Sequence, residues 1–324
     1  MLTLADIKKP VGSEIKEFQT LFKKAVTSDV SLLNIISAYL LRRKGKQVRP
    51  LFVFLTARML GNITKSTYTA ASLIELLHTA TLIHDDVVDE SYERRGFFSI
   101  NALWKSKISV LMGDYFLARG LLLSVNNKDY ELLDIVSNAV KEMSEGELLQ
   151  IQKSRSLNID MDTYYEVIRK KTATLIASCT ASGAKSTGAP RETIDQLYEM
   201  GLHVGMAFQI KDDLFDYQPR GVIGKPTGND IREKKFTLPL IYALNHCPKK
   251  ERRRVLRLFR NGKMHSRRIN EIVHFVKQTG GLDYAEEKMM EYKQKAEDIL
   301  HQFEDNASRQ ALQDLIDFTV LRKK

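Results

Sequence analysis

The sequence predicts an all-α fold, and three observations carry this prediction. Leu, Ile, Ala, Glu and Lys recur at helical spacing along almost all of the 324 residues. Prolines number only seven, and no stretch rich in Pro, Gly or Ser forms a linker. Length alone allows one large domain or two smaller ones. Because no linker is visible, we expect a single domain over residues 1–324.

The first segment with a distinct signature lies just before a proline. The sequence GKQVRP places Lys46 and Arg49 three residues apart, ahead of a helix that starts near Pro50. Proline suits the first turn of a helix, and the amide groups of that turn favour anions. We therefore expect Lys46 and Arg49 to meet an anionic ligand.

A wide apolar surface marks Ala70 to His84 as a buried central helix, formed by Leu73, Ile74, Leu76, Leu77, Ala80, Leu82 and Ile83. Another apolar stretch runs from Val204 to Ile210, and Lys170-Lys171-Thr172 opens an apolar helix between these two. The expected loops are Gly61-Asn62, Ser91 to Gly96, Asn126-Asn127, Gly183 to Pro190, and Gln218 to Phe236. The last of these is long and polar. Because long loops inside compact helical domains are commonly functional, we expect it to act as a lid.

Two aspartate-rich pentads follow apolar helical stretches, and they stand 127 residues apart. On a helix, residues i and i+4 share a face, so Asp85 pairs with Asp89 and Asp212 with Asp216. Like charges crowded at a half-buried helix end are costly unless cations compensate them. Oxygen ligands without Cys or His favour Mg²⁺, which completes its coordination with waters and substrate phosphates. One such pentad is common on solvated helix ends, but two with matching flanks predict metal sites.

Basic side chains group around the pentads, as a diphosphate ligand requires. A lone Lys or Arg is usually solvated surface, so the grouping carries the prediction. Arg offers phosphate a bidentate fork and Lys a point charge. His78 lies two turns before Asp85 on the same face, and the phosphate chemistry beside it favours a binding role over a core role. The basic residues of this group are Lys46, Arg49, Arg94, Arg95, Lys171, Lys225 and Lys235.

The net charge of +10 is concentrated in one segment, with ten Lys/Arg between Lys249 and Arg268 against the single acid Glu251. Such a segment suits an anionic membrane surface or nucleic acid, and a solvated helix face is an equally good interpretation. No aromatic interleaving or known nucleic-acid module accompanies it, so we expect no nucleic-acid partner.

Cysteine usage and hydropathy indicate the compartment. Cys179 and Cys247 give neither a disulfide framework nor metal-ligand spacing, which fits a reducing, cytoplasmic compartment. We expect no signal peptide at Met1 to Lys9, and no run of 18 apolar residues predicts a membrane span.

The sequence strongly resembles the trans-isoprenyl diphosphate synthases, also called the polyprenyl synthetase family. The resemblance extends from about residue 20 to the C-terminus, and its order and spacing make it highly specific. It lies in Gly45 to Pro50, Glu75 to Gly96, Gly113 to Tyr115, Gly146 to Gln150, Lys171-Thr172, Gly205 to Tyr217, and Gly224 to Pro239.

The resemblance implies a fold, a reaction and its partners. The fold is an all-α bundle of roughly ten or more helices around a central cavity, usually paired as a homodimer. The reaction joins isopentenyl diphosphate to an allylic diphosphate head to tail, with about three Mg²⁺ ions bound alongside the diphosphate. In this family no protein nucleophile is needed, because departure of the diphosphate leaves the allylic carbon as a cation.

Residue roles follow from the same resemblance. Asp85, Asp89 and Asp212 would bind Mg²⁺ directly, and Asp86, Asp213 and Asp216 would support them. The allylic diphosphate would be held by Arg94, Lys171, Thr172, Gln209, Lys225 and Lys235. Isopentenyl diphosphate would be held by Lys46, Arg49, His78 and Arg95. One departure is that the family commonly has Gly where this chain has Lys234, which leaves open whether Lys234 or Lys235 contacts phosphate.

Four residues ahead of Asp85 predict the length of the product: Ala80, Leu77, Leu76 and Leu73. Short-chain relatives place a large aromatic at the first of these positions and so block the hydrocarbon tunnel. The methyl group of Ala80 cannot block it, and His78 to Thr81 looks like the corresponding stretch of octaprenyl synthases. We therefore expect a product longer than farnesyl or geranylgeranyl, and a tunnel floor within Tyr115 to Leu123.

Several other functions stay open at this point. A short-chain farnesyl or geranylgeranyl synthase is the main alternative. A class I terpene cyclase would usually carry an Asn/Ser/Glu triad as its second motif, and a noncatalytic partner subunit would usually lack a pentad. A basic nucleic-acid-binding protein would bind with a steep salt dependence. A long polyprenyl product is nearly insoluble, so its release would require a membrane or detergent, with the Lys249 to Arg268 segment as a possible contact.

Overall fold

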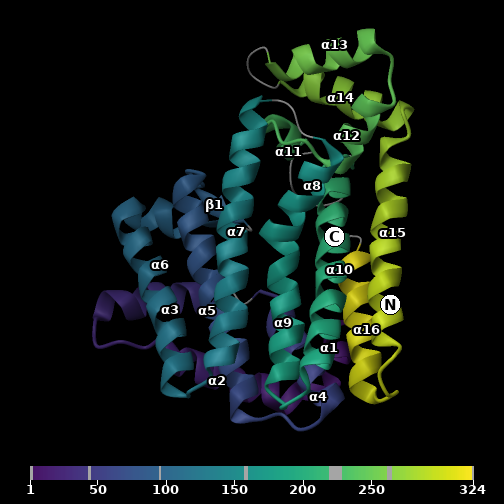
Figure 1. The fold of residues 1–324 in the computed structure, drawn as a ribbon. Helices are drawn as coiled ribbons and strands as arrows, with labels where there is room; N and C mark the ends of the chain where they lie inside the picture. Colours follow the sequence, from purple (N-terminus) through teal and green to yellow (C-terminus); the bar gives the residue numbers. More distant parts are fainter. Residues whose placement is uncertain are drawn as a thin grey trace. The chain divides into compact units, whose positions relative to one another are not determined.

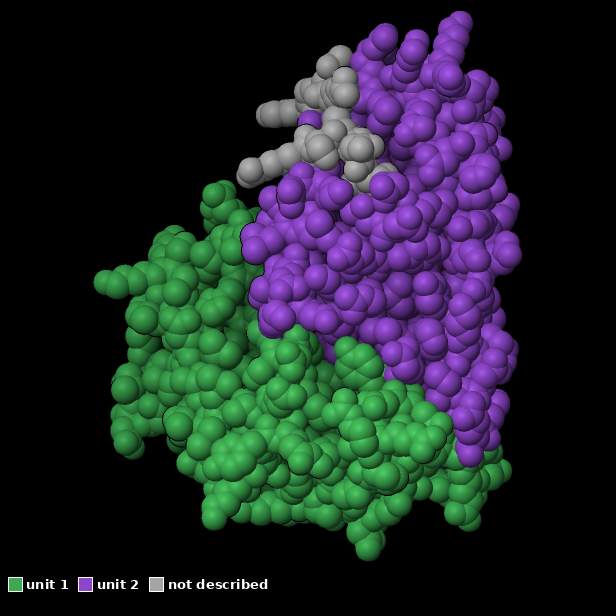
Figure 2. Space-filling view, viewed as in Figure 1, with its two compact units in different colours: residues 1–140, 178–198, 303–315 green, residues 141–177, 199–302, 316–324 purple. Residues whose placement is uncertain are grey.

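The computed structural model describes residues 3–42, 45–94, 96–156, 160–218, 228–260 and 265–322. Within these ranges there are sixteen α-helices, and the only strands form one small hairpin (Figure 1). The prediction of an all-α fold is confirmed. The chain divides into two compact units, and the expectation of one domain over residues 1–324 stays a prediction. Unit 1 comprises residues 1–140, 178–198 and 303–315, and unit 2 comprises residues 141–177, 199–302 and 316–324 (Figure 2).

Unit 1 is built from the N-terminal helices. The helix α5 is its centre, packing against α4 and α6, while α2 packs against both α4 and α5. A 3₁₀ turn at Lys9–Val11 joins the first two helices. The helices are α1 (Leu4–Ile7), α2 (Gly12–Ala25), α3 (Ser31–Arg42), α4 (Val48–Leu60), α5 (Lys65–Val88) and α6 (Ile100–Asn126).

The predicted central helix is α5, and it is longer than the apolar stretch that identified it. Thr64 caps its N-terminus in a reciprocal capping box with Thr67, which satisfies amide groups that the first turn leaves unpaired. Most of its side chains from Ala70 to Ile83 are buried. Burial on nearly all sides explains why its apolar surface is so wide, and it places the first aspartate pentad at the end of a rigid core element.

Two glycines let α6 approach α5 closely. A Cβ at Gly113 would lie 2.2 Å from Nε2 of His84, and a Cβ at Gly120 would lie 3.3 to 3.5 Å from leucine side chains of α5. A side chain at Gly113 would require the imidazole of His84 to move. By length and composition α6 is also the one helix among the described residues that could cross a membrane. In unit 1 it packs against α5.

Unit 2 contains six complete helices, centred on α12. Pro239 stands in the first turn of α12, where its missing amide hydrogen costs nothing. The helix α12 packs against α8, α13, α14 and α15. These elements are α8 (Met161–Ile168), α11 (Asn229–Arg232), α12 (Leu238–Asn245), α13 (Lys249–Arg260), α14 (Ser266–Gln278) and α15 (Gly281–Leu300).

Four further helices contribute residues to both units, because the unit boundaries fall inside them. They are α7 (Tyr130–Ser156), α9 (Thr174–Lys185), α10 (Arg191–Phe215) and α16 (Ala307–Val320). The helix α10 carries the second pentad at its C-terminal end, and the residues of this end belong to unit 2.

Local details differ from the sequence predictions at three places. The expected loop at Ser91 to Gly96 contains strand β1 (Glu93–Arg94), which pairs antiparallel with β2 (Phe97–Phe98). The expected loop at Gly183 to Pro190 starts later, because α9 continues to Lys185. Lys170 and Lys171 do not open a helix but lie in a π-helical turn, Arg169–Ala173, that joins α8 to α9. Such turns need i to i+5 hydrogen bonds, for which apolar periodicity gives no signal.

Candidate active site

The first pentad lies at the C-terminal end of α5 in unit 1. The helix ends at Val88, and Asp89 is its C-cap, donating its amide hydrogen to the carbonyl oxygen of Asp85 at 2.8 Å. The side chain of Asp89 is exposed, that of Asp85 is half-buried, and that of Asp86 is 4% exposed. A helix C-terminus carries partial negative charge, so carboxylates there are unfavourable without a cation. The site chemistry therefore fits a cation-binding position.

The predicted isopentenyl diphosphate residues that the structure describes lie on two packed helices of unit 1. Arg49 is half-buried in the first turn of α4, and His78 is buried on α5. Lys46 is exposed just before α4. The charge of Arg49 also acts on Cys179, partly offsetting the burial that raises the pKa of this thiol to about 12. Arg49 is thus near the interior of unit 1, at the helix end that favours anions.

The chain-length residues form one buried surface of α5. Leu73, Leu76, Leu77 and Ala80 are at most 3% exposed. The three leucines surround the position where Gly120 of α6 approaches. Gly120 falls within the expected floor segment, Tyr115 to Leu123, so the structure places that segment against the predicted tunnel wall.

A connected hydrogen-bond network surrounds the second pentad in unit 2. Thr172 donates its hydroxyl hydrogen to Oε1 of Gln209 at 2.8 Å. Gln209 donates from Nε2 to Oδ1 of Asp213 at 3.0 Å, and the hydroxyl of Tyr164 donates to Oδ2 at 2.7 Å. Predicted site residues from two parts of the sequence, the π-helical turn and α10, therefore meet here. Tyr164 was not predicted, because a tyrosine in an apolar helix is normally interpreted as a core residue.

Asp216 stands one residue beyond the end of α10, as Asp89 stands one residue beyond the end of α5. The helix α10 ends at Phe215, and the carboxylate of Asp216 accepts the amide hydrogens of Asn229 at 2.7 Å and Asp230 at 3.2 Å. Asp216 therefore holds the start of α11. The pairing of Asp85 with Asp89, and of Asp212 with Asp216, stays a prediction.

Burial and mutual repulsion disfavour the charged forms of these carboxyl groups. Burial, and then the charge of Asp230, raises the pKa of Asp213 to about 7. Burial, and then the charge of Asp216, raises the pKa of Asp230 to about 6. Burial likewise raises the pKa of Asp216. A cation in this region would relieve the repulsion. Asp230 was missed because a single aspartate in a polar loop gives no signal of its own.

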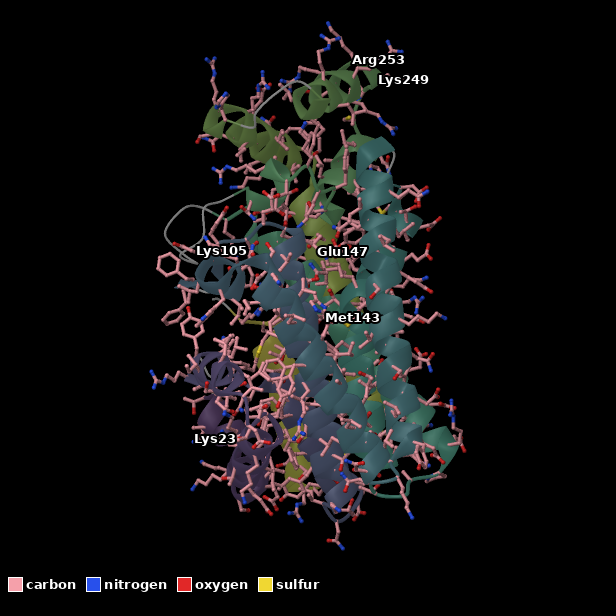
Figure 3. The ribbon with its side chains drawn as sticks, turned by 90° about the vertical axis from the view of Figure 1, so that its left-hand side faces the viewer. Lys23, Lys105, Met143, Glu147, Lys249 and Arg253 are labelled. Atoms are coloured by element: carbon pink, nitrogen blue, oxygen red, sulfur yellow. The ribbon has the colours of Figure 1, made fainter. Side chains whose placement is uncertain are left out.

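Two lysines bring positive charge to the same region. Lys171, in the π-helical turn, donates to Oε1 of Gln150 at 2.8 Å and forms an ion pair with Glu147 of α7, which is labelled in Figure 3. Lys235 lies 2.6 Å from Oε2 of Glu233 and lowers the pKa of Asp230. Both lysines can exchange these surface carboxylates for a ligand's phosphate oxygens.

These residues line a pocket of about 100 Å³ that lies wholly in unit 2. Its polar lining includes Lys171, Thr172, Gln209, Asp213, Asp230 and Lys235, and its apolar lining includes Val167, Ile168 and Phe236. Lys235 lines this pocket and Lys234 does not. Cations, carboxylates and an apolar wall in one pocket suit a phosphate ester that carries a hydrocarbon.

Arg322 is a further residue that sequence reasoning missed. Its guanidinium forms an ion pair with Asp212. It also lies over the ring of Phe208 at 4.4 Å and that of Phe215 at 5.4 Å. This places a cation from the C-terminal end of the chain on one of the predicted metal ligands. A metal ion at Asp212 would have to share or replace that contact.

The carboxylates fit an Mg²⁺ ion that is shared with substrate phosphates better than an ion enclosed by protein ligands alone. Among the described residues, no three His, Cys, Asp or Glu side chains converge to hold a metal ion. Mg²⁺ usually takes only one or two carboxylates and completes its octahedron with waters and substrate phosphates. In unit 1, Asp85 or Asp89 would supply a single oxygen of this kind, and in unit 2 Asp212 would do so independently.

Three of the predicted basic residues cannot be placed. Arg95 and Lys225 lie outside the described residues, and so do residues 219–227 of the expected lid. Arg94 is described only as part of strand β1.

The chain matches the polyprenyl synthetase family over residues 30–276. The chain belongs to this family. Members of the polyprenyl synthetase family are transferases of prenyl groups, and the pocket in unit 2 collects the polar and apolar groups that such a substrate requires. The family membership confirms the resemblance stated above.

Individual relatives cover nearly the whole chain. An all-trans-nonaprenyl-diphosphate synthase (geranyl-diphosphate specific) of Rhodobacter capsulatus is 34% identical, covering 96% of this chain and 95% of its own. The octaprenyl diphosphate synthase of Escherichia coli (strain K12) is 32% identical and is covered over 100% of both chains. Names among other similar proteins range from short-chain isoprenyl and geranylgeranyl to heptaprenyl diphosphate synthases.

A solved structure confirms the fold. The polyprenyl synthase of Caulobacter crescentus CB15, complexed with calcium and isoprenyl diphosphate, superposes with a TM-score of 0.90 at 32% identity, covering 99% of this chain and 98% of the other. The all-α fold is therefore that of the polyprenyl synthases. Each pentad of this chain ends a long helix of that fold.

Proposed function

We propose that this member of the polyprenyl synthetase family makes an all-trans, long-chain polyprenyl diphosphate, octaprenyl-like in length, from isopentenyl diphosphate and an allylic diphosphate. The observation that carries the length is Ala80, a buried methyl group on the α5 surface that also holds Leu76 and Leu77. A growing hydrocarbon that starts near Asp85 meets no aromatic ring at this position. The relatives' names span several lengths, so length is the part that needs a direct test.

The pocket of unit 2 supplies the groups for the allylic diphosphate. Lys171 and Lys235 hold its oxygens, and the hydrogen-bonded pair of Thr172 and Gln209 orients it. Val167, Ile168 and Phe236 keep water from the allylic carbon, which would otherwise be quenched as an alcohol. Fixed cations aimed at the departing diphosphate favour the separated charges over the ester.

A divalent metal belongs to this proposal. The Caulobacter crescentus structure holds calcium with isoprenyl diphosphate, and we assign Mg²⁺ to this chain, about three ions with the diphosphate. When bound, Mg²⁺ neutralises charge on the leaving pyrophosphate. The pyrophosphate then leaves with the bonding electron pair, the isopentenyl double bond attacks the allylic cation, and the proton lost in the last step goes to the pyrophosphate.

A homodimer is part of the proposal and is supported by α6. Its exposed apolar residues Val110, Leu111, Leu121, Leu122 and Val125 lie on one face by helical period. The exposed Asp114 lies on the same face, and an exposed apolar patch commonly marks an interface. A second copy of the chain would cover it.

Two further parts of the proposal concern where the enzyme works. The two cysteines are free thiols in the described structure, in keeping with a cytoplasmic location. A polyprenyl product of this length is nearly insoluble in water, so its release requires an apolar acceptor such as a membrane.

One experiment tests both the activity and the length. The purified protein is incubated with labelled isopentenyl diphosphate, Mg²⁺ and each allylic primer in detergent, and the dephosphorylated products are sized by thin-layer chromatography. We expect products longer than geranylgeraniol, and none without a divalent metal. Products that stop at farnesol or geranylgeraniol would instead establish the short-chain alternative.

A further inference from the structure

The helix α13 is amphipathic, but its apolar side is already used within unit 2. Val255 and Phe259 are fully buried, and the ring of Phe259 stacks on Phe236 with centroids 5.1 Å apart. The helix also packs against α12. Because this side is covered by the protein, α13 cannot insert an apolar face into another phase as interfacial helices do. Any partner of α13 must meet its other side.

The other side of α13 is exposed and cationic (Figure 3, where Lys249 and Arg253 are labelled). Arg254 is neutralised, because it pairs with Glu251 and with Glu271 of α14. Within the ranges that the structure describes, no ion pair joins the remaining exposed cations of the helix to a carboxylate. We call these five residues the basic face: Lys249, Lys250, Arg252, Arg253 and Arg257.

The neighbouring helix adds charge of the same sign. Arg267 and Lys277 of α14 are exposed, and the single acid of α14, Glu271, is the one that Arg254 takes. In Figure 1 both helices lie together at the top of the view, beyond α12. The local field outside α13 is therefore positive, without an acidic group on either helix left to oppose it.

We propose that the basic face docks on an anionic lipid surface, by charge and without insertion. Several Lys and Arg on a short helix are what an anionic leaflet attracts. Nucleic acid is the other polyanion, but single-strand binding sites use exposed aromatic rings, and the one aromatic of α13, Phe259, is buried. The docking goes beyond the proposed function, since it needs no catalysis, and it would bring the enzyme to the apolar acceptor of its product.

The expected effect is large enough to measure. Each Lys or Arg held near an anionic surface strengthens binding by roughly fivefold. Neutralising three of the five residues should therefore weaken binding by roughly 100-fold. Because the attraction is between exposed charges, added salt should weaken it as well.

The test is co-sedimentation of the full chain with vesicles, in the absence of any prenyl substrate. The vesicles contain phosphatidylcholine alone or with about one-third phosphatidylglycerol. The test variant is Arg252→Gln/Arg253→Gln/Arg257→Gln. The matched control is Lys16→Gln/Lys23→Gln/Lys24→Gln, which removes the same charge from exposed positions on α2. Circular dichroism checks that both variants fold.

The outcomes separate clearly. The proposal expects wild-type and control proteins to sediment with anionic vesicles only, and the α13 variant to stay in solution while keeping its synthase activity in detergent. Equal loss in both variants would mean that only net charge matters, and unchanged sedimentation of the α13 variant would mean that another surface binds. Tighter binding to duplex DNA than to anionic vesicles, measured by fluorescence anisotropy, would also overturn the proposal of lipid docking. Failure of the synthase assay leaves these readouts unaffected.

Discussion

At the scale of single residues, one backbone angle explains why Lys235 and not Lys234 lines the pocket. Lys234 has a φ of 57°, a left-handed conformation that costs a residue with a side chain about 1–2 kcal/mol. Glycine adopts it without strain. Lys234 thus stands at a turning position of the backbone. Lys235 follows this turn, and its backbone amide donates its hydrogen to the backbone carbonyl oxygen of Asp230 at 2.8 Å.

This geometry predicts different kinetics for the two lysines. Lys235→Ala removes a charged donor from the pocket, so kcat/KM for the allylic substrate should fall about 10- to 100-fold. Lys234→Ala should have a much smaller effect, and Lys234→Gly, which also relieves the left-handed strain, should be nearly silent. Steady-state kinetics with varied allylic substrate measures this. Equal losses for Lys234→Ala and Lys235→Ala would contradict it.

Asp213 predicts how stability changes with pH. Its pKa is raised from 3.8 to about 7 in the folded protein. Between these values the folded carboxyl keeps a proton that the unfolded chain has lost, so the free energy of unfolding falls as pH rises from about 4 to 7. In Asp213→Asn this fall in the free energy of unfolding is absent, because the amide does not ionise. We expect the variant to gain a few kcal/mol over wild type near pH 8 and little near pH 4.

Urea unfolding at both pH values, with chelator present, measures this difference. Asp298→Asn serves as the control, because Asp298 is exposed on α15. A gain for Asp213→Asn that is the same at both pH values would contradict the assignment of the shift to the buried carboxyl.

The sequence identified some of these site residues and not others. Thr172, Gln209 and Asp213 were predicted as site residues, because motif resemblance identifies them without knowledge of their contacts. Tyr164, Asp230 and Arg322 were not, because each acts through a partner that is distant in sequence and has no local signature. The ends of α5 and α10, each one residue before the last aspartate of a pentad, were not predicted either. Helix periodicity gives a face but not the residue at which the helix ends.

At the scale of elements, the pentads end the helices α5 and α10. Their carboxylates therefore face the negative ends of the helix dipoles. Apolar periodicity predicted both helices, since their buried surfaces are continuous over several turns. It could not predict the π-helical turn at Arg169–Ala173 or the hairpin of β1 and β2, which depend on hydrogen bonds rather than on burial. The close approach of α6 to α5 depends on Gly113 and Gly120, whose role is visible only in three dimensions.

The α5 surface predicts that product length can be changed at one position. Ala80→Tyr places an aromatic ring on the buried surface ahead of Asp85. The product should then shorten to about fifteen or twenty carbons, because the ring fills the space that the hydrocarbon would enter. Chromatography of the dephosphorylated product measures the length. Leu82→Phe is the control, since residue 82 lies on another side of α5. Unchanged length in Ala80→Tyr would refute the tunnel assignment.

At the scale of the whole molecule, the surface carries two features that the fold itself does not require. One is the apolar stripe of α6, and the other is the basic face of α13. Composition predicted the second, because ten basic residues in one segment are visible in the sequence. It could not predict the first, because an apolar helix is usually buried, and only its packing shows which side is left exposed.

The exposed apolar stripe of α6 predicts that substitutions on this face disrupt the homodimer. Leu111 and Leu122 are more than half exposed and lie three turns apart on one face. Leu111→Glu/Leu122→Glu should convert a homodimer into a monomer, because burying two carboxylates in an apolar interface is costly. Light scattering after gel filtration measures the mass. Leu21→Glu on α2 should leave the dimer intact, and a dimer that survives the double substitution would place the interface elsewhere.

The two cysteines differ in a way that provides an experimental tool. Burial makes the thiol of Cys179 unreactive at ordinary pH, with its pKa raised to about 12. Cys247 is only half-buried and stands two residues before α13. A maleimide dye should therefore label the native chain at one position without any substitution. An environment-sensitive fluorophore there would sense a bilayer as it approaches, so lipid docking and catalysis can be followed on the same unmodified sequence.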